Sequence, residues 1–180
     1  MASAASVDYG TNYHIDSAHS QAAFGVHLFW IHEISGRFTQ ITGLMRAGPA
    51  PATVIVDATI TVDSVAVDSQ ITRRWLLSRE FFDATRYPTV RFISDPFPLS
   101  ALDSGGDLPG LLNLRGITAP VHFTLKPMYC PPTVSPSICR VVLSGHLQRS
   151  DFGMISHRAA VSDQVELKLD IALQVTRHQS

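Results

Sequence analysis

Near the C-terminus, Val165-Glu166-Leu167-Lys168-Leu169-Asp170-Ile171-Ala172-Leu173-Gln174-Val175 places an apolar residue at every second position. A period of two is typical of a β-strand with one face in the core and the other in water. Residues 54–63 repeat the pattern, and shorter copies recur along the chain. We therefore predict strands near residues 20–32, 36–46, 53–63, 88–96, 109–116, 120–128, 139–149 and 164–175.

One stretch has a different period. Residues 69–84 read SQITRRWLLSREFFDA, in which Ile71, Trp75 and Leu76 recur at helical spacing before Tyr87-Pro88 ends the pattern. We predict one short helical crossover here. Eight alternating strands with short turns indicate a sandwich or a closed barrel, and closure removes the exposed sheet edges. The predicted fold class is all-β, an eight-stranded antiparallel barrel, which side chains can fill or which can hold one ligand.

Composition restricts the classes of partner. The chain of 180 residues is 45% hydrophobic and 16% charged, which is typical of folded chains and not of disordered ones. Its 14 Lys and Arg residues against 15 Asp and Glu residues form no basic run, so we expect no nucleic-acid partner and no polybasic membrane anchor. No run of about 18 apolar residues occurs, so we expect no stable membrane insertion.

The N-terminus and the cysteines bear on the compartment. Residues 1–12 lack the charged and apolar parts of an intact signal peptide, and we expect a disordered or artificially added extension before a barrel domain at 13–176. Cys130 and Cys139 bracket the proline-rich segment PPTVSPSI and are a candidate disulfide, worth about 2.5–3 kcal/mol. A disulfide favours a periplasmic or secreted protein. Two free thiols in a cytoplasmic protein are the alternative.

Candidate catalytic and metal-binding residues are weak. Asp16, His19 and Ser20 share one turn, where neighbouring side chains diverge, and we expect Asp16 and Ser17 to cap local backbone N–H groups. The chain has no GxSxG and no HExxH, and His27 and His32 would point to opposite faces of a strand. We therefore predict no catalytic residues, no metal site and no required cofactor.

The order of several short motifs is more specific than any one of them. They are Tyr13-His14-Ile15-Asp16, Phe24-Gly25-Val26, Gly36-Arg37-Phe38, LLSREFFD at 76–83, LNLRGIT at 112–118, Arg149-Ser150-Asp151-Phe152-Gly153 and DQVEL at 163–167. In this order the chain resembles the YceI-like family of polyisoprenoid-binding, lipocalin-like bacterial proteins over residues 13–175. The resemblance implies an extended lipocalin-like barrel that binds amphiphilic lipids such as isoprenoid quinones or polyprenyl phosphates, often in the periplasm.

We expect the ligand-binding side chains to be apolar and to lie on inward strand faces or in the motif loops. They are Phe24, Val26, Leu28, Trp30, Val54, Val56, Ile60, Trp75, Phe81, Phe82, Phe92, Leu114, Phe123, Phe152 and Met154. The chain departs from the family where a histidine is usual at Leu28, and where Thr72-Arg73 and Trp75-Leu76 replace Arg-Asp and His-Leu. Fewer polar groups near the mouth favour an apolar ligand, although Arg73, Arg74 or Arg79 could serve a head group.

The predicted function is to bind, store or transport a long-chain lipid inside the barrel, such as an isoprenoid quinone, a polyprenyl chain or an acyl chain. Alternatives are a scavenger of lipophilic small molecules, a stress protein, a filled structural barrel, and a lipid-modifying enzyme on the same barrel. An enzyme would need titratable groups on the inward faces, which are almost entirely apolar. A homodimer through Ile55 or Val142 on the outer faces is a further expectation.

Overall fold

The computed structural model describes residues 12–131 and 138–176, and nearly all of the alternating segments in it are strands. The strands are β1 (Asn12–Ile15), β2 (Gln21–Leu28), β3 (His32–Phe38), β4 (Ile41–Ala47), β5 (Thr53–Thr61), β6 (Val65–Ala66), β7 (Thr89–Ser94), β8 (Phe97–Pro98), β9 (Gly106–Leu114), β10 (Ile117–Leu125), β11 (Ile138–Gln148) and β12 (Gln164–Thr176). The helices are α1 (Gln70–Leu77) and α2 (Ala101–Ser104), with 3-10 turns η1 (Ser17–His19), η2 (Val62–Ser64) and η3 (Arg149–Phe152).

The sheet closes on itself through its longest strand, β12. One edge of β12 pairs with β11, and the other pairs with β2 and then with β1. β1 with β2 forms one wall strand interrupted by η1, and β3 with β4 forms the next, because β1 pairs with β4 and β2 with β3. The remaining strands follow in the order β5, β7, β9, β10 and β11. The result is a closed eight-stranded antiparallel barrel, which confirms the predicted fold class.

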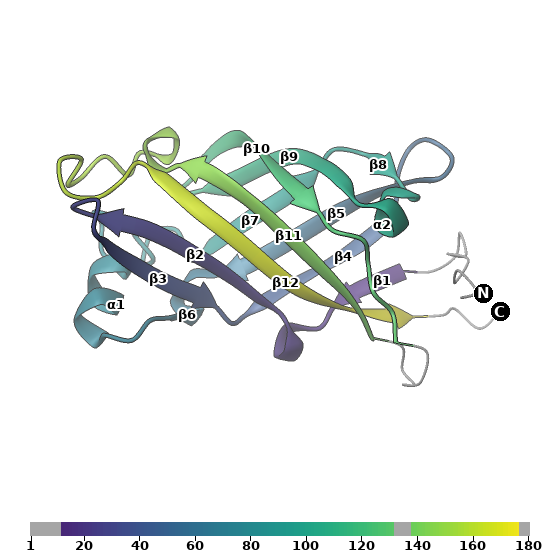
Figure 1. The fold of residues 1–180 in the computed structure, drawn as a ribbon, viewed down its shortest axis with the longest axis horizontal. Coiled ribbons are helices and arrows are strands. Elements are labelled where there is room, and N and C mark those ends of the chain that lie inside the picture. Colours follow the sequence, from purple (N-terminus) through teal and green to yellow (C-terminus); the bar gives the residue numbers. More distant parts are fainter. Residues whose placement is uncertain (1–11, 132–137, 177–180) are drawn as a thin grey trace.

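The barrel is elongated and has two distinct ends (Figure 1). The β2–β3 hairpin, α1 and the loop between η3 and β12 lie at one end, and α2 and β1 lie at the other. Ion pairs between neighbouring strands occupy the outer surface, for example Arg91 with Asp57 at 2.7 Å and Arg140 with Asp170 at 2.8 Å. Polar residues therefore face outward and apolar residues inward, as the period of two requires.

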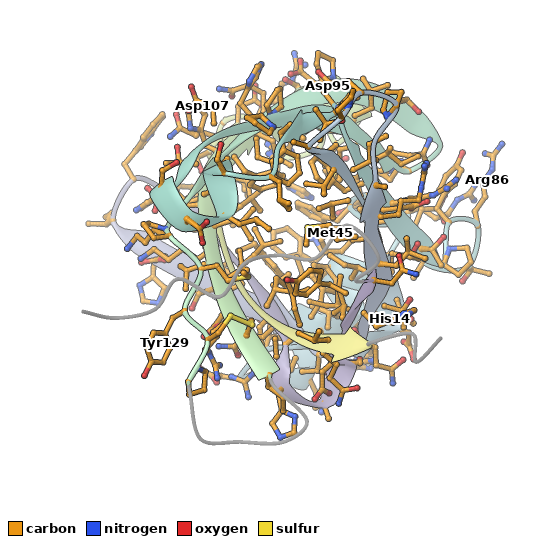
Figure 2. All side chains as sticks on the ribbon, turned by 90° about the vertical axis from the view of Figure 1, so that its right-hand side faces the viewer. His14, Met45, Arg86, Asp95, Asp107 and Tyr129 are labelled. Atoms are coloured by element: carbon orange, nitrogen blue, oxygen red, sulfur yellow. A yellow bond between two sulfur atoms is a disulfide. The ribbon has the colours of Figure 1, made fainter. Side chains whose placement is uncertain are left out.

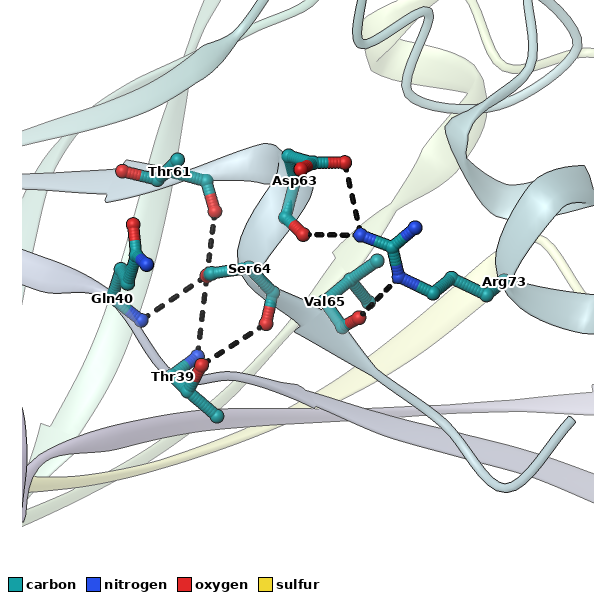
Figure 3. A network of polar contacts seen from close by, with 7 residues as sticks. All are labelled: Thr39, Gln40, Thr61, Asp63, Ser64, Val65 and Arg73. Carbon is teal, nitrogen blue, oxygen red and sulfur yellow. Dashed lines mark hydrogen bonds and ion pairs between the residues drawn. The ribbon is translucent and has the colours of Figure 1, made fainter. Parts of the chain in front are cut away.

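Two strand predictions need correction. The segment 36–46, predicted as one strand, bends between Phe38 and Ile41, because the Ser64 hydroxyl accepts the backbone N–H groups of Thr39 and Gln40 (Figure 3). The strand predicted at 20–32 ends at Leu28, where the chain turns. The short elements β1, β6, β8 and α2 carry too few residues for a periodic signal and were not predicted.

The helical crossover is present but shorter than predicted. α1 begins after Ser69, whose hydroxyl accepts the Thr72 N–H at 3.4 Å, and ends at Leu77. The Ser78 hydroxyl donates to the Trp75 carbonyl at 2.6 Å and closes the helix, and the chain continues as turns. The helix therefore covers only the first half of the predicted segment.

The cysteine prediction is confirmed, since Cys130 and Cys139 form a disulfide. Cys139 begins the buried face of β11 at 2% exposure, and Tyr129 pairs with Arg140 beside it. Residues 1–11, which include nearly all of the predicted N-terminal extension, and the proline-rich segment 132–137 lie outside the described residues.

Candidate functional site

The inward faces of the strands enclose an apolar cavity of about 190 Å³. Figure 2 looks along the barrel from the end that carries α2, and it shows the strands as a ring with Met45 directed into the interior. The lining positions on β12 run from Val165 to Leu173, which at about 3.3 Å per residue and a tilt of about 40° span roughly 20 Å along the barrel axis. The cavity is therefore a long, narrow space and not a shallow surface pocket.

Aromatic side chains lie along the cavity wall because glycines on the neighbouring strands leave room for them. Phe24 faces Gly36 across the β2–β3 pair, and a Cβ on Gly36 would lie 2.7 Å from the Phe24 Cζ atom. Phe123 faces Gly145 in the same way, with 2.9 Å between such a Cβ and the Phe123 Cδ1 atom. Because glycine has no side chain, each ring can approach the neighbouring backbone closely, and less of it occupies the lumen.

Aromatic rings pack against one another around the α1 end of the cavity. Phe24, Phe38 and Phe82 form a cluster with ring centroids 5.4–6.0 Å apart. Trp75 of α1 packs against Phe81 with centroids 4.4 Å apart. Three of these four pairs are edge-to-face, an arrangement that adds to the stabilisation from burial of the rings, so they hold the turn after α1 firmly against the barrel.

Among the described residues that line the cavity, Arg149 is the only ionisable one. It is 1% exposed, and its guanidinium donates to the backbone carbonyls of Met154, Ser156, Val161 and Ser162. Burial lowers the pKa of Arg149, which Asp163 partly opposes. The side chain therefore ties together the loop that precedes β12, and four of its five N–H donors are engaged by that loop.

A polar contact joins this loop to the turn after α1. The His157 ring Nε2 lies 2.8 Å from a Glu80 carboxylate oxygen, and the Trp75 Nε1 donates to the same oxygen at 3.1 Å. The hydrogen bond with His157, followed by that with Trp75, lowers the pKa of Glu80. The two segments that cover the α1 end of the cavity are thus fastened to each other as well as to the barrel.

The structure brings ten of the fifteen predicted binding residues to the cavity wall. These are Phe24, Val26, Val56, Ile60, Phe81, Phe82, Phe92, Leu114, Phe123 and Met154. Val54 and Phe152 are buried away from the cavity, and Leu28 and Trp75 pack half-buried against the core. Trp30 is 83% exposed, so its expected place in the lining is wrong. The chain turns after Leu28, and the alternation of β2 does not continue to Trp30.

Several lining residues were not among the predicted ones. Val165, Leu167, Leu169, Ile171 and Leu173 lie on the inward face of β12. Their alternation with polar residues marks the inward face of this strand, so the sequence carries a signal for them. Leu102 from α2 had no such signal, because a helix of four residues shows no period.

The candidate head-group cations do not line the cavity. Figure 3 shows Arg73 bound instead to η2 and β6, where its guanidinium contacts the Asp63 carboxylate at 2.9 Å and the Val65 carbonyl at 3.1 Å. Arg74 and Arg79 also lie outside the lining. None of these three arginines therefore supplies a charged group to the cavity wall.

The turn at Asp16 is a structural feature. Asp16 caps η1 by accepting the Ala18 N–H at 3.0 Å, as predicted, and also contacts the His19 ring at 2.8 Å. The Ser20 hydroxyl donates to the Asp16 carbonyl and accepts the Ala172 N–H, so it faces β12.

Within residues 12–131 and 138–176, no three His, Cys, Asp or Glu side chains are grouped as metal ligands, and neither helix is long and apolar enough to cross a membrane.

The fold and the cavity define a class of closed β-barrels with a long apolar interior. The family model for the YceI-like domain matches residues 13–173, and the chain belongs to this family. No curated protein matches the chain.

Three solved structures share the fold. BcnA of Burkholderia cenocepacia is 20% identical with a TM-score of 0.72, covering 88% of this chain and 98% of that one. A polyisoprenoid-binding domain from Saccharophagus degradans, implicated in plant cell wall breakdown, is 13% identical with a TM-score of 0.68, covering 91% and 98%. A Campylobacter jejuni YceI protein is 21% identical with a TM-score of 0.63, covering 82% and 88%.

Proposed function

We propose that this protein binds the hydrocarbon chain of a lipid inside the barrel and stores or carries it. The observation that supports this most directly is the lining that residues 12–131 and 138–176 provide, in which Arg149 is the only residue that is not apolar. Each methylene moved from water into such an environment contributes about 0.8 kcal/mol. A chain of isoprenoid or acyl type that follows the roughly 20 Å of lining would bind tightly without any polar contact.

The same lining favours an apolar ligand over one with a pyrophosphate head. A buried phosphate requires charge-assisted partners, and four backbone carbonyls already engage Arg149. We therefore infer a quinone, prenyl or acyl chain as the ligand, with any strongly charged group outside the barrel. The similar fold of the S. degradans polyisoprenoid-binding domain is consistent with this class of ligand.

The proposal assigns binding and not catalysis. General acid–base chemistry needs a titratable group beside the reacting atoms, and Arg149 is the single ionisable group at the described cavity wall. The Cys130–Cys139 disulfide supports a periplasmic or secreted location, because such bonds persist in oxidising compartments. No bound cofactor is part of the proposal.

A chain-length series tests the proposal. Purified protein is titrated with 11-(dansylamino)undecanoic acid, and the probe is then displaced by n-alkanols and prenyl alcohols of increasing length. Affinity should rise about fourfold per methylene until the cavity is full and then level off. Mass spectrometry of organic extracts of the purified protein should find a chain of the same length class. Absence of displacement at every length, together with extracts free of lipid, would overturn the proposal.

A further inference from the structure

The hairpin between β2 and β3 exposes three consecutive large apolar side chains. Phe29, Trp30 and Ile31 are 60%, 83% and 89% exposed. Single exposed apolar residues are ordinary on protein surfaces, whereas a contiguous group marks an interaction site. We call these three residues the apolar tip.

The backbone of the hairpin directs the apolar tip outward. Phe29 and Trp30 have positive φ angles of 49° and 63°. The Ile31 N–H donates to the Leu28 carbonyl at 3.3 Å, and the Phe29 N–H donates to the Ala160 carbonyl at 2.6 Å. Asn and Gly are the residues that such a turn ordinarily carries. The fold therefore has no need of aromatic side chains at these two positions.

Other exposed apolar residues lie at the same end of the barrel. The loop at 153–161, which contacts the hairpin through Ala160, carries Ile155 with 57% exposure. The first turn of α1 carries Ile71 with 73% exposure, and Figure 1 shows α1 and the hairpin at one end. The cavity reaches this end, where Phe81 and Met154 line it. The apolar tip is thus close to one end of the proposed lipid site.

We propose that the apolar tip inserts into the interfacial layer of a lipid bilayer and presents the α1 end of the barrel to the membrane. The inference rests on the proposed function, because a lipid carried in the cavity has to enter from or leave to a bilayer. Trp and Phe are the side chains best suited to this layer, where an apolar ring meets polar head groups. Docking of this kind is shallow and reversible.

The size of the apolar tip favours a bilayer over a second copy of the chain. At about 200 Å² for each large side chain, the exposed parts of the three residues present roughly 450 Å². A stable interface between proteins needs about 800 Å² from each partner. A small protruding group can enter a deformable bilayer, but it offers too little surface for a stable dimer.

Charge around the apolar tip indicates how it would bind. His32 and Glu33 follow it on β3, and Glu80 contacts His157 in the adjoining loop. The exposed cations at this end, Arg74, Arg79 and Arg158, are matched by the exposed carboxylates Glu33, Asp68 and Glu80. Cations are not in excess, so attraction to anionic lipids contributes little. We expect docking to uncharged phosphatidylcholine vesicles, with little change between low salt and about 0.5 M NaCl.

The test uses flotation with phosphatidylcholine vesicles and the fluorescence of Trp30. The chain has two tryptophans, and Trp75→Phe leaves Trp30 as the only one. The single-tryptophan protein should float with the vesicles, and its emission should shift to the blue and be quenched by lipids brominated near the head group. Phe29→Asn combined with Trp30→Gly suits the turn and should lower the fraction bound at least tenfold. Leu111→Ser, which removes a 50% exposed side chain from the outer wall, is the matched control and should float as the unchanged protein does.

Several outcomes would overturn the inference. They are no flotation at any concentration of phosphatidylcholine, equal flotation of the double variant, and binding that requires anionic lipid and disappears at high salt. A concentration-dependent dimer that the double variant abolishes, without vesicle binding, would assign the tip to a second copy instead. The solution titration with 11-(dansylamino)undecanoic acid separates the two proposals, because the double variant should keep its affinity for this probe. If the double variant no longer docks on vesicles but still binds the probe, the result concerns the apolar tip and leaves the proposed lipid binding in the cavity intact.

Discussion

Filling the cavity from its wall should weaken binding by a calculable amount. Ala58 lies on the inward face of β5 opposite Phe92 and lines the cavity. Ala58→Leu adds three carbons to the lumen and should displace about three methylenes of a long ligand. At about 0.8 kcal/mol per methylene this costs about 2.4 kcal/mol, or roughly a fiftyfold rise in Kd for the longest chains. Thr59→Leu, on the outward face of the same strand, should leave the Kd for long chains unchanged.

Two measurements on the same variant make the argument refutable. Competition with the alkanol series should show the length limit shortened by about three carbons, while chains too short to reach Ala58 bind as before. Urea unfolding of the ligand-free variant should show a stability gain of up to about 2 kcal/mol, because the added carbons enter empty space. Overpacking of a filled core would instead cost about 1–3 kcal/mol. A destabilised variant with an unchanged length limit would show that ligand does not occupy this part of the barrel.

Three further predictions concern stability. Cys139→Ser should lower the free energy of unfolding by about 2.5–3 kcal/mol in urea, and reductant should then have no additional effect. Arg91 holds the pKa of Asp57 below its ordinary value, so this pair stabilises the fold above about pH 4 and its contribution is lost as pH falls further. Asp57→Asn should therefore flatten the pH dependence of urea unfolding in that range. Arg149→Met leaves two buried carbonyls, of Met154 and Val161, and two partly buried ones without their donor, and should cost about 3–5 kcal/mol, with Arg149→Lys recovering part of the loss.

The alternation of the strands predicted the inward faces because a period of two assigns each side chain to one face. Phe24 with Val26, and the row from Val165 to Leu173, line the cavity for this reason. The same pattern cannot distinguish a filled barrel from a hollow one. That difference depends on where the rings lie, as with Phe123 over Gly145, and on how the ends of the barrel pack.

Contacts between distant segments account for the other failures. The bend between β3 and β4 depends on the hydroxyl of Ser64, about two dozen residues further along the chain, and no local pattern marks it. Arg149 was predicted as part of a motif, but its role comes from carbonyls that only the folded loop brings around it. Hydrogen bonds of this kind are specified by tertiary geometry, and residue type alone does not predict them.

The wrong prediction for Trp30 carries information of its own. Left-handed backbone at a non-glycine residue costs of order 1–3 kcal/mol, and both Phe29 and Trp30 adopt it. If the hairpin served the fold alone, Phe29→Asn with Trp30→Gly would be a pure improvement, and we expect this variant to be more stable by about 1 kcal/mol or more in urea unfolding. Sites where a sequence breaks a local rule without benefit to the fold are where function is expected. A double variant that gains stability and yet no longer docks on vesicles would establish that the aromatic pair lowers stability in favour of docking. A double variant of lower stability would mean that the aromatic pair stabilises the fold.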